Sequence, residues 1–349
     1  ANLIGNINAG GGGVNRNFVI NGAMNVSQRG TSFADPSNDT YTLDRFIARK
    51  SNDGAVTITQ DSSAPSGFAN SLKVDVTTAD TSIGANQFNM VQHKIEAQNL
   101  QGLAFGTSDA KNFTISFYVK SNKTGTYAVN IVQSDNSSKQ ATLTYTIDSA
   151  NTWERKSLTF TGDTSGVIND DNGTGLSILW WLTAGSTFTS GSTSATFQTY
   201  ANGNAGAGQA VNVLDSTDNT WFITGVQLEV GQNATEFEHE PFERTLTKCQ
   251  RYYEILSVTS STSNLSGPVA VGQNTNERKT IGAYFYKTEK RAAPTVANVT
   301  IGIDAGDTAH AFVFSTDTRS TVGVSTTSTD IGEADGLEGS FNIVVDAEM

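Results

Sequence analysis

Three aromatic residues, Tyr118, Trp181 and Trp221, have the types and positions that best fit a binding chemistry. A flat aromatic face matches the C–H face of a pyranose ring, while neighbouring amides and carboxylates bond the sugar hydroxyls. Each of the three rings opposes or extends the apolar face of an expected strand. We interpret them as candidate glycan-binding residues, with burial under loops or in a subunit interface as the alternative.

Two neighbouring carboxylates suggest a cation site. Asp170 and Asp171, in the run Asp170-Asp-Asn-Gly173, are hard ligands of the kind calcium prefers, although the same residue types are ordinary turn formers. A structural calcium is therefore the cofactor to test for, and no cofactor is required. The histidines lie in no metal-protease or nucleophile-elbow pattern. We predict no catalytic residues, and a glycan depolymerase built on two nearby carboxylates stays an alternative.

Charge and composition exclude several classes of partner. The chain has 34 acidic and 22 basic residues, and its net charge of -12 repels nucleic acid phosphates and anionic lipid headgroups. No apolar run is long enough to predict a membrane-spanning segment. Cys249 is the single cysteine, so no internal disulfide can form. We therefore expect neither a nucleic acid partner nor membrane insertion.

The elements that must position these residues are strands. From Phe18 onward, alternating segments are separated by clusters of Gly, Asn, Asp and Ser. In residues 113–119 every second residue is apolar, which leaves Tyr118 on the opposite face. Residues 176–182 are apolar on both faces, as expected of a central strand that is covered on each side. The pattern predicts an all-β protein built on a sandwich or jelly roll.

The chain divides into four expected segments. Residues 1–16, which include a glycine-rich hinge, form an attachment arm. Residues 17–240 form a jelly-roll β-sandwich, residues 241–256 a short connecting helix, and residues 257–349 a small C-terminal β-sandwich domain. The helical spacing aligns four residues for packing between domains or subunits, namely Leu246, Cys249, Tyr253 and Leu256.

Several motifs carry a family resemblance. The run Asn17-Phe-Val-Ile-Asn-Gly-Ala-Met-Asn-Val-Ser-Gln-Arg-Gly30, followed by Tyr41-Thr-Leu-Asp-Arg-Phe46, resembles the opening of a family of phage tail-fibre and virion proteins. Trp221-Phe-Ile-Thr-Gly-Val-Gln-Leu-Glu-Val-Gly231, Pro241-Phe-Glu-Arg244 and Cys249-Gln-Arg-Tyr-Tyr-Glu254 follow in the order that the family shows. The second domain resembles the family through Lys290-Arg-Ala-Ala-Pro-Thr295 and Asp346-Ala-Glu-Met349. This resemblance implies a virion adhesin rather than an enzyme.

The first domain also resembles jelly-roll carbohydrate-binding modules. The similarity lies in the Asn-Gly opening strand, residues 113–120, Trp153-Glu-Arg-Lys-Ser-Leu-Thr-Phe160 and a closing Val-Gln-Leu-Glu strand. Such modules often carry a structural calcium ion. Their usual acidic residue after Asn-Gly is Ala23 here, which departs from the calcium-binding pattern.

Together, the residues and the resemblance predict a phage tail fibre that attaches the virion to host cell-surface glycan. Asn2, Leu3 and Ile4 of the arm would dock into another virion protein, such as a tail or baseplate adaptor. A homotrimer is expected, because several copies turn weak single-site binding into strong attachment. The expected location is the virion, after assembly in the host cytoplasm. The alternatives are a capsid decoration or other structural protein that binds only virion subunits, and a depolymerase.

Overall fold

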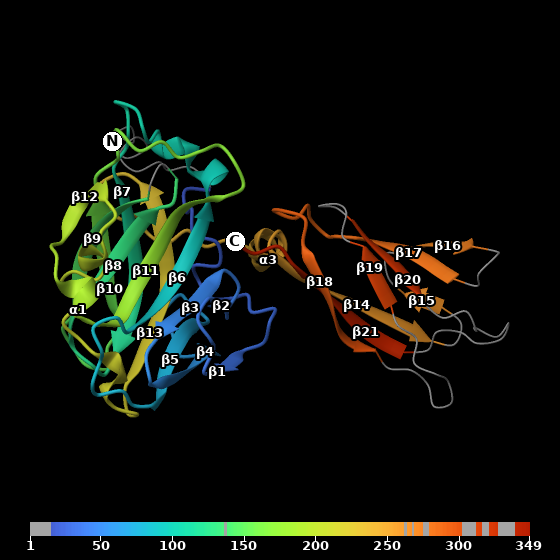
Figure 1. Cartoon of the computed structure of the whole chain (residues 1–349), viewed down its shortest axis with the longest axis horizontal. Helices are drawn as coiled ribbons and strands as arrows, with labels where there is room; N and C mark the ends of the chain where they lie inside the picture. The colour runs from blue at the N-terminus through green and yellow to red at the C-terminus, as the bar shows by residue number, and fades with distance from the viewer. Residues whose placement is uncertain are drawn as a thin grey trace, which may run out of the picture. The chain divides into compact units, whose positions relative to one another are not determined.

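The computed structural model describes residues 15–135, 138–261, 264–266, 269–274, 279–301, 312–315, 321–326 and 339–349. Asn2, Leu3 and Ile4, the predicted virion contacts, lie outside these residues. The chain forms two compact units, of which the first ends at Phe242 and also contains Met349, and the second runs from Glu243 to Glu348. Strands dominate each unit, which confirms the predicted all-β class (Figure 1).

The first unit is built from two antiparallel sheets. Alternating apolar residues favour strands that bury one face each. In spatial order, the six-stranded sheet contains β1 (Ser32–Ala34), β4 (Ala55–Asp61), β5 (Ser71–Thr78), β13 (Thr220–Val230), β7 (Phe113–Ser121) and β10 (Glu154–Phe160). The seven-stranded sheet contains β12 (Ser194–Thr199), β9 (Lys139–Ile147), β8 (Gly125–Gln133), β11 (Thr174–Ala184), β6 (Phe88–Glu96), β3 (Phe46–Ser51) and β2 (Thr40–Tyr41).

Strand β11 lies in the middle of the seven-stranded sheet, between β8 and β6 (Figure 1). Residues 176–182 are all buried, which confirms the prediction of a central strand covered on both faces. Ile178 and Trp180 belong to the main core between the two sheets. Leu179 and Trp181 belong to a smaller apolar cluster on the outer face of the sheet. This strand therefore separates two apolar regions.

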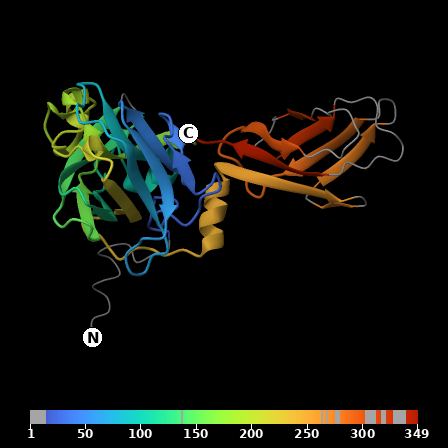
Figure 2. The ribbon, with the colours of Figure 1, turned by 90° about the horizontal axis from the view of Figure 1, so that it is seen from below.

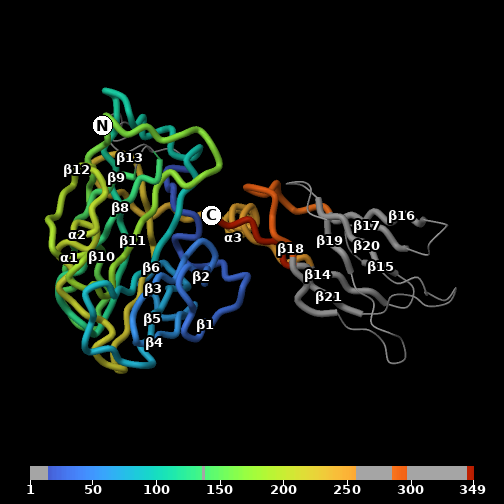
Figure 3. Tube along the Cα trace, viewed as in Figure 1, coloured from blue at the N-terminus to red at the C-terminus, as the bar shows by residue number. Residues whose placement is uncertain are grey.

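Short helices lie beside the strands of the first unit. They are η1 (Ala97–Leu103), α1 (Ser186–Thr189), α2 (Asn202–Ala205) and η2 (Val213–Asp215). Helices α1 and α2 contact each other and lie side by side (Figure 3). Phe188 of α1 and Ala205 of α2 both pack in the outer apolar cluster with Trp181, so these helices cover part of the outer sheet face. Among the described residues, no helix is long and apolar enough to cross a membrane.

A β-bulge in β13 changes which residues face the core. The register between β13 and β7 shifts around Gly225, whose φ is +61°. Trp221 before the bulge and Leu228 after it both lie in the main core. An extra residue in a strand reverses its alternation, so odd-numbered residues face inward before the bulge and even-numbered residues after it.

The opening motif holds the chain against β13. Asn17 Nδ2 donates to the Val226 carbonyl oxygen at 3.1 Å. A Cβ atom on Gly22 would lie only 2.1 Å from the same carbonyl oxygen, so this close approach requires glycine. Asn21 Nδ2 donates to the backbone oxygen of Asp44 at 3.0 Å. The residues that carry the family resemblance thus stabilise the fold.

Ionisable groups are buried behind this motif. The Asp44 carboxylate accepts hydrogen bonds from the backbone N and Nε2 of Gln28, at 2.7 and 2.5 Å, and burial raises its pKa. His93 Nε2 lies 3.2 Å from the Ile20 carbonyl oxygen. Burial, with a smaller contribution from the Arg45 charge, lowers the pKa of His93 to about 3. The imidazole is therefore neutral at ordinary pH.

Helix α3 (Phe242–Gln250) leads into the second unit (Figure 2). One sheet of this unit contains β15 (Asn264–Ser266), β14 (Tyr253–Ser261), β21 (Gly339–Asp346) and β18 (Thr295–Ile301). The other contains β16 (Val269–Asn274), β17 (Lys279–Phe285), β20 (Thr321–Thr326) and β19 (Phe312–Ser315). These two sheets are the small C-terminal β-domain expected from the sequence.

The predicted connecting helix is too long. It ends at Gln250, and Tyr253 and Leu256 lie in β14, which pairs with β21 from Tyr253 to Ser260. The segment after the helix is rich in aromatic and aliphatic residues, which suit a pleated, half-buried surface and favour a strand over a further helical turn. Tyr253 and Leu256 therefore do not share a helix face with Leu246 and Cys249.

Candidate functional site

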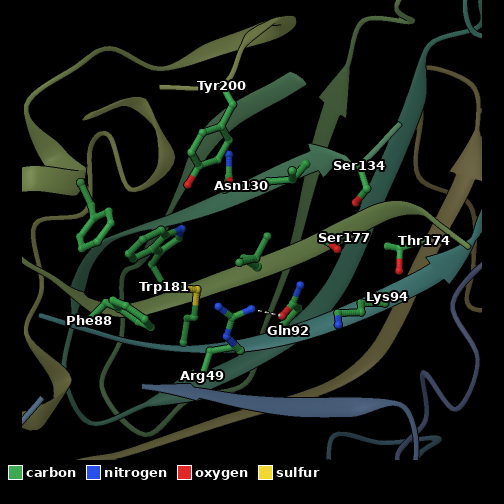
Figure 4. Close-up of a pocket in the computed structure, with 14 residues that line it drawn as sticks. Arg49, Phe88, Gln92, Lys94, Asn130, Ser134, Thr174, Ser177, Trp181 and Tyr200 are labelled. Atoms are coloured by element: carbon green, nitrogen blue, oxygen red, sulfur yellow. Dashed lines mark hydrogen bonds between the residues drawn. The ribbon is translucent and has the colours of Figure 1, made fainter. Parts of the chain in front are cut away.

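A pocket of about 460 Å³ lies on the outer face of the seven-stranded sheet (Figure 4). Side chains from β3, β6, β8 and β11 form its base, because alternate residues of neighbouring strands point to the same face. Phe188 of α1 and Tyr200, which follows β12, contribute from outside the central strands. Its lining comprises Arg49, Phe88, Met90, Gln92, Lys94, Asn130, Val132, Ser134, Thr174, Ser177, Leu179, Trp181, Phe188 and Tyr200.

Three aromatic rings form one side of the pocket. The Trp181 ring lies 6.3 Å from Phe88 and 5.4 Å from Phe188, and the two Phe rings lie 5.5 Å apart, measured between centroids. Trp181 is only 2% exposed, whereas Phe88 and Phe188 are half-buried. A Cβ atom on Gly206 would lie 3.3 Å from the indole, so the chain after α2 packs closely against this ring. Trp181 forms the floor and the two Phe rings offer accessible apolar surface.

Anchored amides line the pocket on either side of β11. Asn130 Nδ2 donates to Thr142 Oγ1 at 2.8 Å, and Gln92 Oε1 accepts from Arg49 Nη1 at 2.8 Å. Both amides are buried, at 1% and 4% exposure. Hydrogen bonds of this kind fix side chains in one orientation before a ligand arrives, which lowers the cost of binding. Polar groups placed beside apolar rings suit a ligand with both hydroxyls and C–H faces.

Tyr200 lies at the edge of the pocket and is 39% exposed. Partial burial raises the pKa of its phenol, and the Arg49 charge acts in the opposite sense. The hydroxyl is therefore protonated at neutral pH and can both donate and accept a hydrogen bond. The ring and hydroxyl together provide an apolar surface with a polar end.

The three rings predicted from the sequence do not lie together. Trp181 lines the pocket, as its prediction requires. Tyr118 lies on the outer face of the six-stranded sheet, half-buried against Phe68 with their centroids 5.4 Å apart. Trp221 is 0% exposed in the main core, and its Nε1 donates to Tyr145 Oη at 3.3 Å. The prediction of a glycan contact at Trp221 is thus wrong, because the bulge in β13 turns this ring inward.

The predicted calcium ligands lie in an exposed turn. Asp170 and Asp171 are both exposed, and Asp171 Oδ1 accepts a hydrogen bond from the Gly173 backbone N at 2.8 Å. This bond is the ordinary role of an aspartate in a turn. Among the residues that the structure describes, no group of three or more His, Cys, Asp or Glu side chains is arranged to hold a metal ion.

The residues predicted for packing lie around the start of the second unit. Cys249 is fully buried in α3, and Leu246 is half-buried. Tyr253 and Leu256, at 7% and 5% exposure, are buried in β14. All four residues are therefore at least partly buried by other residues of the same chain.

Sequence reasoning missed most of the pocket. Phe88 and Gln92 come from β6, Asn130 from β8 and Tyr200 from the loop after β12, and their proximity depends on strand order. One signal was available, namely the unusual apolar outer face of residues 176–182, which requires a cover. Phe88, Gln92 and Lys94 are even-numbered residues of β6 and share the face opposite the core.

No protein-family model and no curated protein matches the chain. Solved structures with a similar arrangement include the enzymatically active domain of tailspike protein 4 from bacteriophage CBA120, at 14% identity over 62% of this chain, with a TM-score of 0.34. The chain spans 21% of that tailspike structure. A family 11 carbohydrate-binding module of a Clostridium thermocellum cellulosomal cellulase matches 58% of this chain and 98% of its own, at 14% identity and a TM-score of 0.30.

A xylan-binding domain of carbohydrate-binding module family 22 matches 60% of this chain and 99% of its own. Its identity is 14% and its TM-score 0.29. TM-scores near 0.3 are too low to transfer a site or a function from any of these structures. The fold class rests on the strands and sheets of this chain, and the function is argued from its own pocket.

Proposed function

We propose that the protein is an attachment protein of the phage tail-fibre kind, whose pocket on the seven-stranded sheet binds host cell-surface glycan. The observation that carries this proposal is the side-by-side placement of half-exposed rings and anchored amides in one hollow. Phe88 and Phe188 offer faces for sugar C–H groups, and Gln92, Asn130 and Tyr200 offer polar atoms for hydroxyls. Binding of this kind needs no chemical turnover.

Placement on a virion is proposed from the resemblance carried by residues 17–30, 41–46 and 221–254. We further propose a homotrimer, since one shallow sugar site binds weakly and several linked sites raise the effective concentration at a surface. Mass measurement of the full chain by light scattering tests this state. A trimer mass supports multivalent attachment, whereas a monomer mass at micromolar concentration contradicts it.

The glycan site is tested by substitutions on the two outer faces. Phe88→Ala and Tyr200→Ala, in the pocket, are expected to weaken binding to host cells about tenfold, or about 1.4 kcal/mol. Tyr118→Ala, on the six-stranded sheet, is the matched control because it also removes a half-buried ring but lies outside the pocket. Thermal melts establish that all three variants are folded. Equal weakening in all three, or none in the pocket variants, would place the glycan site elsewhere.

Particle placement is tested by cryo-electron microscopy of the intact virion. Density that radiates from the tail supports the attachment role. Density tiled on the capsid shell, together with no cell binding, would instead identify a decoration protein.

The depolymerase alternative is tested on host polysaccharide. Canonical glycoside hydrolysis needs two carboxylates beside the sugar, and the residues that line this pocket include no Asp or Glu. We therefore expect polysaccharide length to stay unchanged after long incubation with the protein. A shortened polymer would contradict the binding-only role and point to a second, acidic site.

A further inference from the structure

The geometry points to an acidic sugar residue, one that carries an anionic substituent, as the group that the pocket recognises. This inference rests on the proposed glycan-binding function and specifies its ligand. It is drawn from the charges in the pocket and from one buried donor that lacks an acceptor. A purely neutral glycan could use the rings, the amides and the buried donor, but it would offer no charge to the cationic side chains.

The charged side chains that line the pocket are opposite in sign to the net charge of the chain. Arg49 and Lys94 are the charged residues of its lining, which contains no carboxylate, while the chain carries a net charge of -12. Lys94 Nζ donates to the Met349 backbone oxygen at 2.8 Å, so Arg49 is the cation on which the inference rests. A protein of this charge repels anions over most of its surface at long range. Two cations at one hollow therefore give local complementarity to an anion and also select the place where it binds.

Arg49 is held in a defined position. Its Nη1 donates to Gln92 Oε1 at 2.8 Å, and its Nε donates to Asn38 Oδ1 at 3.2 Å. Asp39 Oδ1 lies 3.0 Å from the same Nε, so the ion pair occupies the Nε edge of the guanidinium. Its Nη2 makes no hydrogen bond to the described residues, and the side chain is 26% exposed. The planar guanidinium therefore keeps N–H donors at its Nη2 end, and such donors suit a carboxylate or a phosphate.

A second donor is independent of Arg49. Trp181 is 2% exposed, and its Nε1 is buried with no hydrogen-bond partner among the described residues. Figure 4 shows this nitrogen on the edge of the ring toward Asn130 and Tyr200. An indole nitrogen only donates, and a buried donor without an acceptor is unfavourable. An anionic oxygen in the pocket would satisfy it.

The ligand test uses an array of bacterial capsular and O-antigen polysaccharides. Each polysaccharide is printed in native form, after reduction of its carboxyl groups to primary alcohols, and after removal of its phosphate groups. Carboxyl reduction converts a uronate into the neutral sugar with the same ring and linkages, so charge is the main difference. The full-length protein is applied, and binding strength is measured at low and high salt.

Binding that is lost on carboxyl reduction, or on phosphate removal, supports the inference and identifies the source of the anion. This binding should also weaken with salt, because screening reduces the attraction between exposed charges. Equal binding to native and neutralised polysaccharide would overturn the acidic ligand and leave the glycan-binding function standing. Binding to none of the polysaccharides would overturn the proposed function, and the inference with it.

Variants provide a second readout on the polysaccharide that binds. Arg49→Gln should reduce affinity about tenfold and flatten the salt dependence, and Arg49→Lys should restore part of both. Lys50→Gln is the matched control, since it removes the same charge from the next residue of β3, where Lys50 pairs with Asp35 outside the pocket. Trp181→Phe keeps a ring but deletes the N–H donor, so it should weaken binding of the native polysaccharide more than binding of the neutralised form. An Arg49→Gln variant that binds like its parent would overturn the inference.

Discussion

The two outer faces of the sandwich both carry aromatic side chains but leave them in different surroundings. On the seven-stranded sheet, Phe88 and Phe188 stand beside an open pocket. On the six-stranded sheet, Phe68 packs between Tyr118 and Phe237, with ring centroids 5.4 and 5.0 Å away. Phe237 comes from the segment that follows β13 and lies over this face. One set of rings is accessible to a ligand and the other is used to fix a segment of chain.

A lysine side chain also covers aromatic rings on the outer face of the six-stranded sheet. Lys120 Nζ lies 4.1 Å from the Phe222 ring centroid and 5.1 Å from that of Trp153, and it donates to Ser63 Oγ at 2.6 Å. Burial lowers the pKa of Lys120, opposed by the nearby Asp61. An outward-facing ring is accessible to a ligand only where its neighbours leave its face open.

Trp221 is buried between the two sheets, so its loss should destabilise both of them and the side chains on both outer faces. We expect Trp221→Ala to destabilise the first unit by about 3–5 kcal/mol, because a fully buried ring leaves a cavity. Trp153→Ala, a half-buried ring on the outer face, should cost about 1 kcal/mol or less. Urea unfolding of the two variants makes the measurement. Similar costs would contradict a core position for Trp221.

The pocket face depends on a strand with a buried histidine, which predicts acid sensitivity. The pKa of His93 is about 3 when folded and about 6.5 when unfolded, so below pH 6.5 the unfolded chain binds a proton that the folded chain does not. Stability should then fall by about 1.4 kcal/mol per pH unit as the pH drops from 6.5 toward 3. Guanidinium unfolding between pH 7 and pH 4 measures this slope.

A neutral replacement isolates this contribution. His93→Gln should flatten the slope, and His239→Gln, at an exposed position, should leave it unchanged. The raised pKa of Asp44 acts in the opposite sense and is common to all three proteins. A His93→Gln variant with the parent slope would assign the acid sensitivity to other groups.

Gly225 allows a selective disturbance of the six-stranded face. A Cβ atom there would lie 2.7 Å from Phe68 Cζ and 2.9 Å from Tyr118 Cδ2, at a φ of +61°. We expect Gly225→Ala to cost about 1–3 kcal/mol while cell binding per folded molecule stays at the parent level. Gly30→Ala is the control for backbone strain, because φ is also positive there and no atom lies within 4 Å of an added Cβ. A larger cost for Gly225→Ala would then measure the crowding against Phe68 and Tyr118. Loss of binding in folded Gly225→Ala would show that both faces take part.

The smallest expected change in stability concerns Lys120, which lies above the Phe222 ring. Lys120→Met keeps the aliphatic stem but removes the charge above Phe222, so a loss of about 0.5–1 kcal/mol is expected. Lys50→Met removes a lysine that pairs with Asp35, and its cost should be within about 0.5 kcal/mol. Thermal melts at equal pH compare the two. A larger cost for Lys50→Met would contradict the role given to the lysine above the ring.

Local patterns predicted the strands well, because alternation follows directly from strand geometry. Residues 113–119 and 176–182 have the faces that their apolar residues indicate. Strict alternation counted back from Leu228 would put Trp221 on the outer face, but the bulge at Gly225 turns it inward. The extra residue of a bulge has no clear signature in a glycine-rich chain.

The pocket could not be predicted from the sequence, for a different reason. Gln92 and Asn130 are polar residues at outward positions, where solvent exposure is the ordinary expectation. They are 38 positions apart and belong to β6 and β8, which lie on opposite sides of β11. Only the strand order brings them near Arg49 and Trp181, and strand order depends on contacts that are distant in the sequence.

The bulge at Gly225 also bears on how this chain can tolerate evolutionary change. Substitutions along β13 alter one side chain each, but deletion of a single residue at the bulge would restore strict alternation through the strand. Trp221 would then turn toward solvent and Phe222 toward the core, even though no residue type had changed. A point mutation in β13 therefore changes one side chain at a time, whereas single-residue insertions and deletions there should be strongly selected against.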